Sequence, residues 1–179
     1  HTLDLCTADE GYRDHSVREL QRVIDISRDL RGRFRCPAPV LLVTNVGGFS
    51  EHRHLDHDER KPLQQRLIES LGRLNCSGDV EIIPQTMPPF PWHFGGQRFH
   101  DLFVGPGFIH RFCEQQRMRV CLDVSHSKLA CNHLHLPFRD FLNRILPFTA
   151  HLHLADARDV DGEGLQIQDG EIDWVQLFE

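Results

Sequence analysis

The feature that most constrains the fold is a repeat in which a short apolar run is followed by a loop and then a helix. The runs lack polar–apolar alternation, which is typical of parallel strands covered on both faces. They lie at residues 40–46, 80–84, 120–122 and from 150 onward, and residues 2–5 are a possible further strand. Helices are expected at residues 16–30, 62–74, 106–116 and 138–146. This repeat predicts an α/β fold of parallel strands with right-handed crossovers and outer helices.

Local signals refine the expected boundaries. Ser16 with Glu19 three residues later has the pattern of a capping box, so the first helix is expected to begin there. Residues 51–58 place histidines among charged residues, and we interpret them as a solvated loop rather than a metal tract. The long segment 85–101 is rich in proline and glycine and is expected to lack regular structure.

Length and composition bound the class of protein. The chain has 179 residues and a formal net charge of −6, which fits one globular domain over residues 1–179. No apolar run is long enough to span a membrane, and an acidic chain is a poor partner for nucleic acid. The 6 cysteines form no CxxC pair, so we expect reduced, mostly buried thiols and a cytoplasmic protein.

Two of the apolar runs lead into side chains that can bind metal ions or sugar hydroxyls. The first delivers Asp123 and His126. The second delivers His151 and His153, and then Asp156, Asp161 and Glu163. Because loops at the carboxyl ends of barrel strands converge on one mouth, these groups are expected to meet there. His151 and His153 share one face of their strand; for His151 we favour a packed, hydrogen-bonded histidine, and for His153 a ligand.

Three stretches, taken in their order along the chain, resemble the xylose-isomerase-like barrels, a group that holds sugar isomerases and epimerases and apurinic-site endonucleases. LDVSH is similar to the Asp-x-x-His motif of that group. HLHLAD with the later GEIDW resembles its next strand and loop, and IIPQTMPPFPW resembles a strand that normally ends in a metal-binding Glu. The loops also resemble the isomerase-type module sometimes joined to sialic-acid-type synthases.

The resemblance implies a site for one divalent ion, with Asp123, His153 and Gln85 at the matching positions and His126 beside them. Asp and His ligands favour Mn²⁺, Zn²⁺ or Co²⁺ over Ca²⁺. Gln85 replaces the expected Glu and cannot act as a base, and the family's final strand, which carries a second glutamate, is not recognised. The catalytic residues are therefore unknown. The histidines expected of the endonuclease branch are also missing after residues 43–47, so that branch is the least favoured.

The family closes a barrel of about 250 residues, whereas this chain provides only about five strands. We therefore expect a partial (β/α) TIM-barrel type fold. The chain begins at His1 rather than Met. We expect the open edges of the barrel to be covered by a further protein segment or by a homo-oligomer.

The favoured function is a metal-dependent sugar isomerase or epimerase-like domain that acts on a sugar or sugar phosphate. The alternative is a non-catalytic sugar-binding or structural module within a larger synthase. The expected substrate-binding residues are Trp92, His93, His126, His151, Asp156 and Glu163. Trp92 could stack on a sugar face, although the aromatic residues of its loop could equally just cover the barrel mouth.

Overall fold

The computed structural model describes residues 3–34, 38–93 and 95–177. The chain forms two compact units, and each is described by itself. The first comprises His1–Gly48 and Leu55–Pro84, and the second comprises Phe49–His54 and Gln85–Glu179. The prediction of one domain over residues 1–179 stays a prediction.

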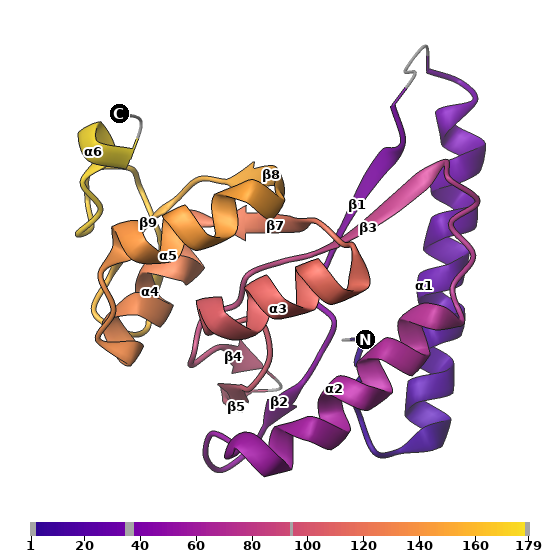
Figure 1. The fold of residues 1–179 in the computed structure, drawn as a ribbon, viewed down its shortest axis with the longest axis horizontal. Coiled ribbons are helices and arrows are strands. Elements are labelled where there is room, and N and C mark those ends of the chain that lie inside the picture. Colours follow the sequence, from indigo (N-terminus) through magenta and orange to yellow (C-terminus); the bar gives the residue numbers. More distant parts are fainter. Residues whose placement is uncertain (1–2, 35–37, 94, 178–179) are drawn as a thin grey trace. The chain divides into compact units, whose positions relative to one another are not determined.

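In the first unit, two strands run in parallel beside two helices (Figure 1). Strands β1 (Val40–Thr44) and β3 (Val80–Pro84) form the sheet, and helices α1 (Glu10–Arg31) and α2 (His57–Gly72) accompany it. Both strands lie where the apolar runs predicted them. The buried side chains of α1 are Ser16, Val17, Leu20 and Ile24, a spacing that places them on one face of the helix.

Both helices of this unit begin earlier than predicted. Helix α1 is capped by Asp9, whose carboxylate accepts from the amide of Tyr12, while Ser16 lies inside the helix and donates to the Tyr12 carbonyl. Helix α2 is capped by Asp56, which forms a capping box with Glu59. In each case an aspartate upstream of the predicted start already satisfies the free amides of the first turn, so the helix begins there.

The possible strand at residues 2–5 is not formed over the described residues 3–5. Leu5 donates one backbone bond to Val46, and the Asp4 carboxylate accepts from the amides of Cys6 and Gly48. These contacts fix an irregular segment instead of a ladder. All five residues of β1 are only half-buried, so the expectation of a strand covered on both faces is also wrong for β1.

The second unit contains another parallel pair. Strands β7 (Val120–Asp123) and β8 (Thr149–His153) pair side by side, as predicted. Helices α3 (Pro106–Gln116) and α5 (Phe138–Ile145) also match the sequence pattern. All four residues of β7 are buried. The core of this unit includes Phe103, Ile109, Phe112, Leu122, Leu129, Phe141 and Ile145.

Helix α4 (Val124–Leu134) was not predicted from the sequence pattern, and it starts directly after β7 with no intervening loop. Asp123 is both the last residue of β7 and the N-cap of α4, because its carboxylate accepts from the amide of His126 at 3.0 Å. The Asp-x-x-His motif is therefore a strand-to-helix turn.

The remaining elements are short. They are β2 (Phe49–Ser50), β4 (Trp92–His93), β5 (Gly96–Gln97), β6 (Phe99–His100), η1 (Leu146–Phe148), β9 (Asp156–Arg158), β10 (Gly162–Leu165) and α6 (Trp174–Leu177). The segment predicted to lack regular structure thus contains three two-residue strands, since β4 pairs with β5 and β6 pairs with β2.

The architecture is an α/β fold, and each unit contains a parallel pair of strands with helices beside it. Within the described residues every sheet has two strands, so no barrel closes. The described cysteines are free thiols, and all of them except the half-buried Cys76 are buried, as predicted, while Cys36 lies outside the described residues. No helix in the described part of the chain has the length and apolar character needed to cross a membrane.

Candidate functional site

Two backbone contacts bring the candidate site together at the carboxyl end of β7. Asp123 at that end is in register with His153 of β8. Gln85 follows β3 in the sequence and forms an isolated parallel bridge with Cys121 of β7. Parallel strands present their carboxyl ends at one edge of a sheet, so the side chains of Gln85, Asp123 and His153 meet there.

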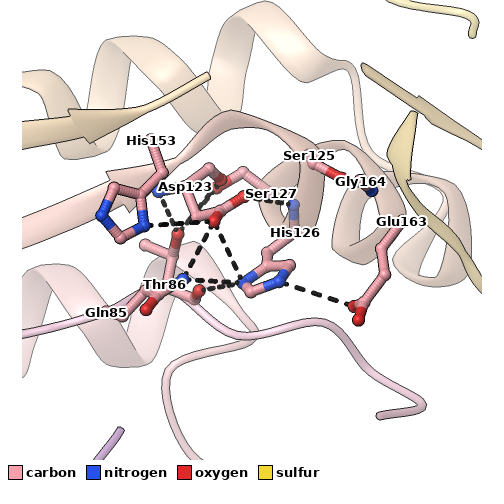
Figure 2. Close-up of polar contacts among 9 residues, drawn as sticks. All are labelled: Gln85, Thr86, Asp123, Ser125, His126, Ser127, His153, Glu163 and Gly164. Carbon is pink, nitrogen blue, oxygen red and sulfur yellow. Dashed lines mark hydrogen bonds and ion pairs between the residues drawn. The ribbon is translucent and has the colours of Figure 1, made fainter. Parts of the chain in front are cut away.

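Asp123 Oδ2 is the common point of this arrangement (Figure 2). It accepts a hydrogen bond from Gln85 Nε2 at 2.9 Å. His153 Nδ1 lies 3.5 Å from the same oxygen, and His126 Nδ1 lies 3.6 Å from it. We call Gln85, Asp123, His126, His153 and Glu163 the Asp123 group.

His126 links Asp123 to Glu163. Its Nδ1 lies 2.9 Å from the carbonyl oxygen of Thr86, and its Nε2 lies 3.5 Å from Glu163 Oε2. A carbonyl oxygen only accepts hydrogen bonds, so Nδ1 carries a proton and Nε2 is the nitrogen that faces Glu163. Strand β10, which carries Glu163, is held nearby because the Gly164 amide donates to Ser125 Oγ at 3.1 Å.

Sequence reasoning missed Thr86 and Ser127, which fix the backbone of Asp123. The Asp123 amide donates to Thr86 Oγ1 at 2.9 Å, and Ser127 Oγ donates to the Asp123 carbonyl at 2.7 Å. Both hydroxyls are fully buried. The signal that could have found Ser127 is local, because Asp123 before a helical run is an N-cap pattern and Ser127 lies four residues later. No local signal links Thr86 to Asp123.

The thiol of Cys121, in the strand that carries Asp123, is unreactive. Cys121 is fully buried, and its burial, followed by the nearby Asp123 carboxylate, raises its pKa to about 12. It therefore stays protonated near neutral pH and is not a candidate nucleophile.

Asp156 does not join the Asp123 group, which corrects the prediction that it binds substrate. Its side chain is fully buried and accepts bonds from Trp174 Nε1 and from the amides of Ala157, Gln168 and Ile172. Burial alone would raise its pKa, but these hydrogen bonds outweigh it and lower the pKa to about 2. A carboxylate that is enclosed and fully engaged organises the loop instead of meeting a ligand.

The other predicted site residues lie elsewhere. Trp92 is 72% exposed in β4, and Phe94, one of the aromatic residues of that loop that could line a pocket or cover the barrel mouth, lies outside the described residues. His151 is exposed on β8, where its ring lies edge-on 5.2 Å from that of His153, so the packed histidine favoured at this position is wrong. Leu152 and Leu154 of the same segment are 41% and 47% exposed because β8 is not covered on both faces.

His93 belongs to a second, histidine-rich cluster. Its ring centroid lies 5.9 Å from that of His100, which is 1% exposed and has no hydrogen-bond partner at either ring nitrogen among the described residues. Burial, and then the nearby imidazoles of His93, His126 and His54, lower the pKa of His100 to about 3.

The predicted metal ion can be tested against the donors that are present. Asp123 Oδ2 and His153 Nδ1 lie close enough to be two ligands of one ion. The third neighbour is the amide nitrogen of Gln85, which donates and cannot bind a cation, and Nδ1 of His126 faces a carbonyl. Among the described residues, no three His, Cys, Asp or Glu side chains are arranged to hold a metal ion. In this arrangement the donors do not form a complete cation site, and the ion stays a prediction.

Comparisons with known proteins agree with the fold. A family model described as a xylose isomerase-like TIM barrel matches residues 1–179. No curated protein matches the chain by sequence.

Among solved structures, the chain is similar to a D-tagatose 3-epimerase-like protein, with a TM-score of 0.71 and 17% identity, over 98% of this chain and 61% of that one. It is also similar to the apo form of the 3-keto-D-glucoside 4-epimerase YcjR from E. coli, with a TM-score of 0.67 and 11% identity, over 99% of this chain and 62% of that one. The chain thus spans about three fifths of the length of each, and at these identities the likeness concerns the fold.

Proposed function

Because this chain belongs to the family of xylose isomerase-like TIM barrels, we propose that it is a sugar isomerase or epimerase-like domain that acts on a polyhydroxylated small molecule. The observation that carries the proposal is the Asp123 group. It places two imidazoles and an amide within 3.6 Å of one carboxylate oxygen at the carboxyl end of parallel strands, where barrel enzymes of many kinds bind their substrates.

The chemistry of the group suits hydroxyl groups. A sugar hydroxyl both donates and accepts hydrogen bonds, and the Asp123 group offers acceptors at Asp123 and Glu163 and donors at Gln85 and the histidines. Glu163 is 48% exposed at its side chain and so remains accessible to a ligand. In our proposal Asp123 and His153 orient the sugar, while His126 and Glu163 contact a neighbouring hydroxyl.

The test is binding and hydrogen exchange with an unphosphorylated ketose and its phosphate ester. D-Fructose and D-fructose 6-phosphate are incubated with the chain in deuterated water, and NMR follows binding and exchange of the hydrogen beside the carbonyl, the step that a proton-transfer isomerase catalyses. Asp123→Asn is expected to weaken binding about tenfold. Asparagine still caps helices, so this change tests the site and not α4.

The matched control is Gln115→Glu, a change at an exposed position of α3, which should leave binding unchanged. If neither sugar binds to the wild-type chain, the proposal is wrong. Preference for one of the two sugars decides between a free sugar and a sugar phosphate.

One observation favours a second candidate, a non-catalytic sugar-binding module within a larger synthase. Gln85 replaces the glutamate expected from the family resemblance, and a neutral amide cannot remove a proton from carbon. Ketose binding without exchange of the hydrogen beside the carbonyl would select this candidate. Binding with exchange would select the enzyme.

A further inference from the structure

The side-chain amide of Gln85 lies between two members of the Asp123 group. Its nitrogen is 2.9 Å from Asp123 Oδ2 and 3.3 Å from His126 Nδ1 (Figure 2). We propose that this amide stands where a divalent cation would have to bind, so that Asp123 is satisfied by a neutral donor and the chain has little affinity for such ions. The inference rests on the Asp123 group as the ligand site of the proposed function, but it concerns metal binding alone.

The identity of the atom that faces Asp123 follows from hydrogen-bond chemistry. An ionised carboxylate only accepts hydrogen bonds, so its neighbour at 2.9 Å must be the amide nitrogen and not the amide oxygen. The Gln85 oxygen, the one atom of this side chain able to bind a cation, therefore points away from Asp123. An ion could use it only after the amide turned and its bond to Asp123 broke.

His126 does not make up for this loss. Its protonated Nδ1 is engaged with the Thr86 carbonyl at 2.9 Å, and its Nε2 is directed at Glu163. Only Asp123 and His153 then have atoms that could bind a cation and that face a shared point. Protein sites for catalytic zinc use three protein ligands, so two leave an ion weakly held.

The Asp123 carboxylate has hydrogen-bond partners at both oxygens without an ion. A carboxylate left without a partner would be costly, and Asp123 is only 8% exposed, but the Gln85 amide, the His126 amide and the nearby His153 ring all contact its oxygens. A glutamate at position 85 would replace the amide that donates to Asp123 with a second carboxylate. Two carboxylates at such a distance repel one another unless a cation or a proton lies between them.

The experiment measures Mn²⁺ binding to the full chain by isothermal titration calorimetry and by the electron paramagnetic resonance signal of free Mn²⁺. Gln85→Glu is expected to bind one Mn²⁺ at least about a hundredfold more tightly than the wild-type chain. Gln115→Glu adds the same charge at an exposed position of α3 and should behave as wild type, so a gain confined to position 85 reports on the site.

A second comparison needs no folded Gln85→Glu variant. If the Gln85 amide occupies the position where a cation would bind, the wild-type chain and Asp123→Asn bind Mn²⁺ equally weakly. If wild type binds one Mn²⁺ tenfold or more tightly than Asp123→Asn, by the order of one lost ligand, the inference is overturned and the divalent ion predicted from the sequence is restored. Neither result depends on sugar binding, so failure here is distinct from failure of the proposed function.

Discussion

At the scale of single residues, His100 is the most unusual side chain of the second unit. It is 1% exposed, and neither ring nitrogen has a hydrogen-bond partner among the described residues. Each buried polar atom left in this state costs about 1–3 kcal/mol. Its pKa of about 3 follows from the same burial, because a charged imidazole is even more costly there than a neutral one.

His100→Phe is therefore expected to stabilise the chain at neutral pH by about 1 kcal/mol, since it keeps the ring and removes the unsatisfied nitrogens. It should also change the response to acid. The unfolded chain binds a proton at His100 below its ordinary pKa of 6.5, whereas the folded chain does so only near 3. Wild-type stability should thus fall as pH drops from about 6.5 toward 3, by about 1.4 kcal/mol per pH unit from this group.

Urea unfolding of wild type and His100→Phe at pH 7 and pH 5 measures both effects, and the stability gap between them should widen at pH 5. His110→Phe replaces a partly exposed histidine of α3 and serves as the control. A variant less stable than wild type at both pH values would show that the ring nitrogens have partners that stabilise the fold.

At the scale of elements, Asp156 organises the segment that follows β8. Three of its four hydrogen bonds join the start of β9 to residues 168–174, including one from the indole of Trp174 at 2.8 Å, and the fourth comes from the adjacent Ala157 amide. Gly170 has room for no larger residue, because an added Cβ would lie 2.1 Å from Asp156 Oδ1. The hairpin that carries Glu163 to the Asp123 group is thus anchored at its base by one buried carboxylate.

Asp156→Asn should lower the free energy of unfolding at pH 7 by about 2 kcal/mol. The NH₂ group of the new asparagine would face N–H groups that also donate, and the negative charge that these hydrogen bonds stabilise would be lost. The folded-state pKa of about 2 lies below the ordinary value of 3.8, so this contribution is present above pH 4 and is lost as pH falls toward 2.

Chemical denaturation at pH 7 and pH 3 should therefore show a smaller difference between wild type and Asp156→Asn at the lower pH. Asp161→Asn, at an exposed position of the same hairpin, is the control and should change little at either pH. An equal loss at both values would mean that shape, and not charge, is what Asp156 supplies.

At the scale of the whole molecule, the open edge of β8 is the feature that bears most directly on association. Within the described residues β8 pairs only with β7, and Leu152 and Leu154 are exposed beside it. An unpaired strand with exposed apolar side chains is a template for association. We predict that a further protein segment or a second copy of the chain covers this edge.

Light scattering over a range of concentrations tests this prediction. The wild-type chain should self-associate, and Leu152→Lys with Leu154→Lys should raise the monomer fraction, because charges on an edge oppose pairing. Ile167→Lys, at a position 44% exposed in a loop, should leave association unchanged. A wild-type chain that is monomeric at every concentration would contradict the prediction.

What the sequence by itself determined about this protein is its local content. The parallel strands β3, β7 and β8 and helix α3 follow from apolar runs and helical periodicity, since these patterns are properties of neighbouring residues. The family resemblance likewise rests on short motifs, and the structure brings Asp123, His126 and His153 together as their places after consecutive strands imply.

Only the tertiary structure decided the contacts between residues distant in the chain. Gln85 donates to Asp123 across 38 positions, Thr86 holds the Asp123 backbone across 37, and Trp174 reaches Asp156 across 18. No periodicity encodes such pairs, because hydrogen bonds between separate segments depend on how the segments pack. For the same reason the sequence could not show that Asp156 anchors the segment after β8, or that the Gln85 amide donates to Asp123.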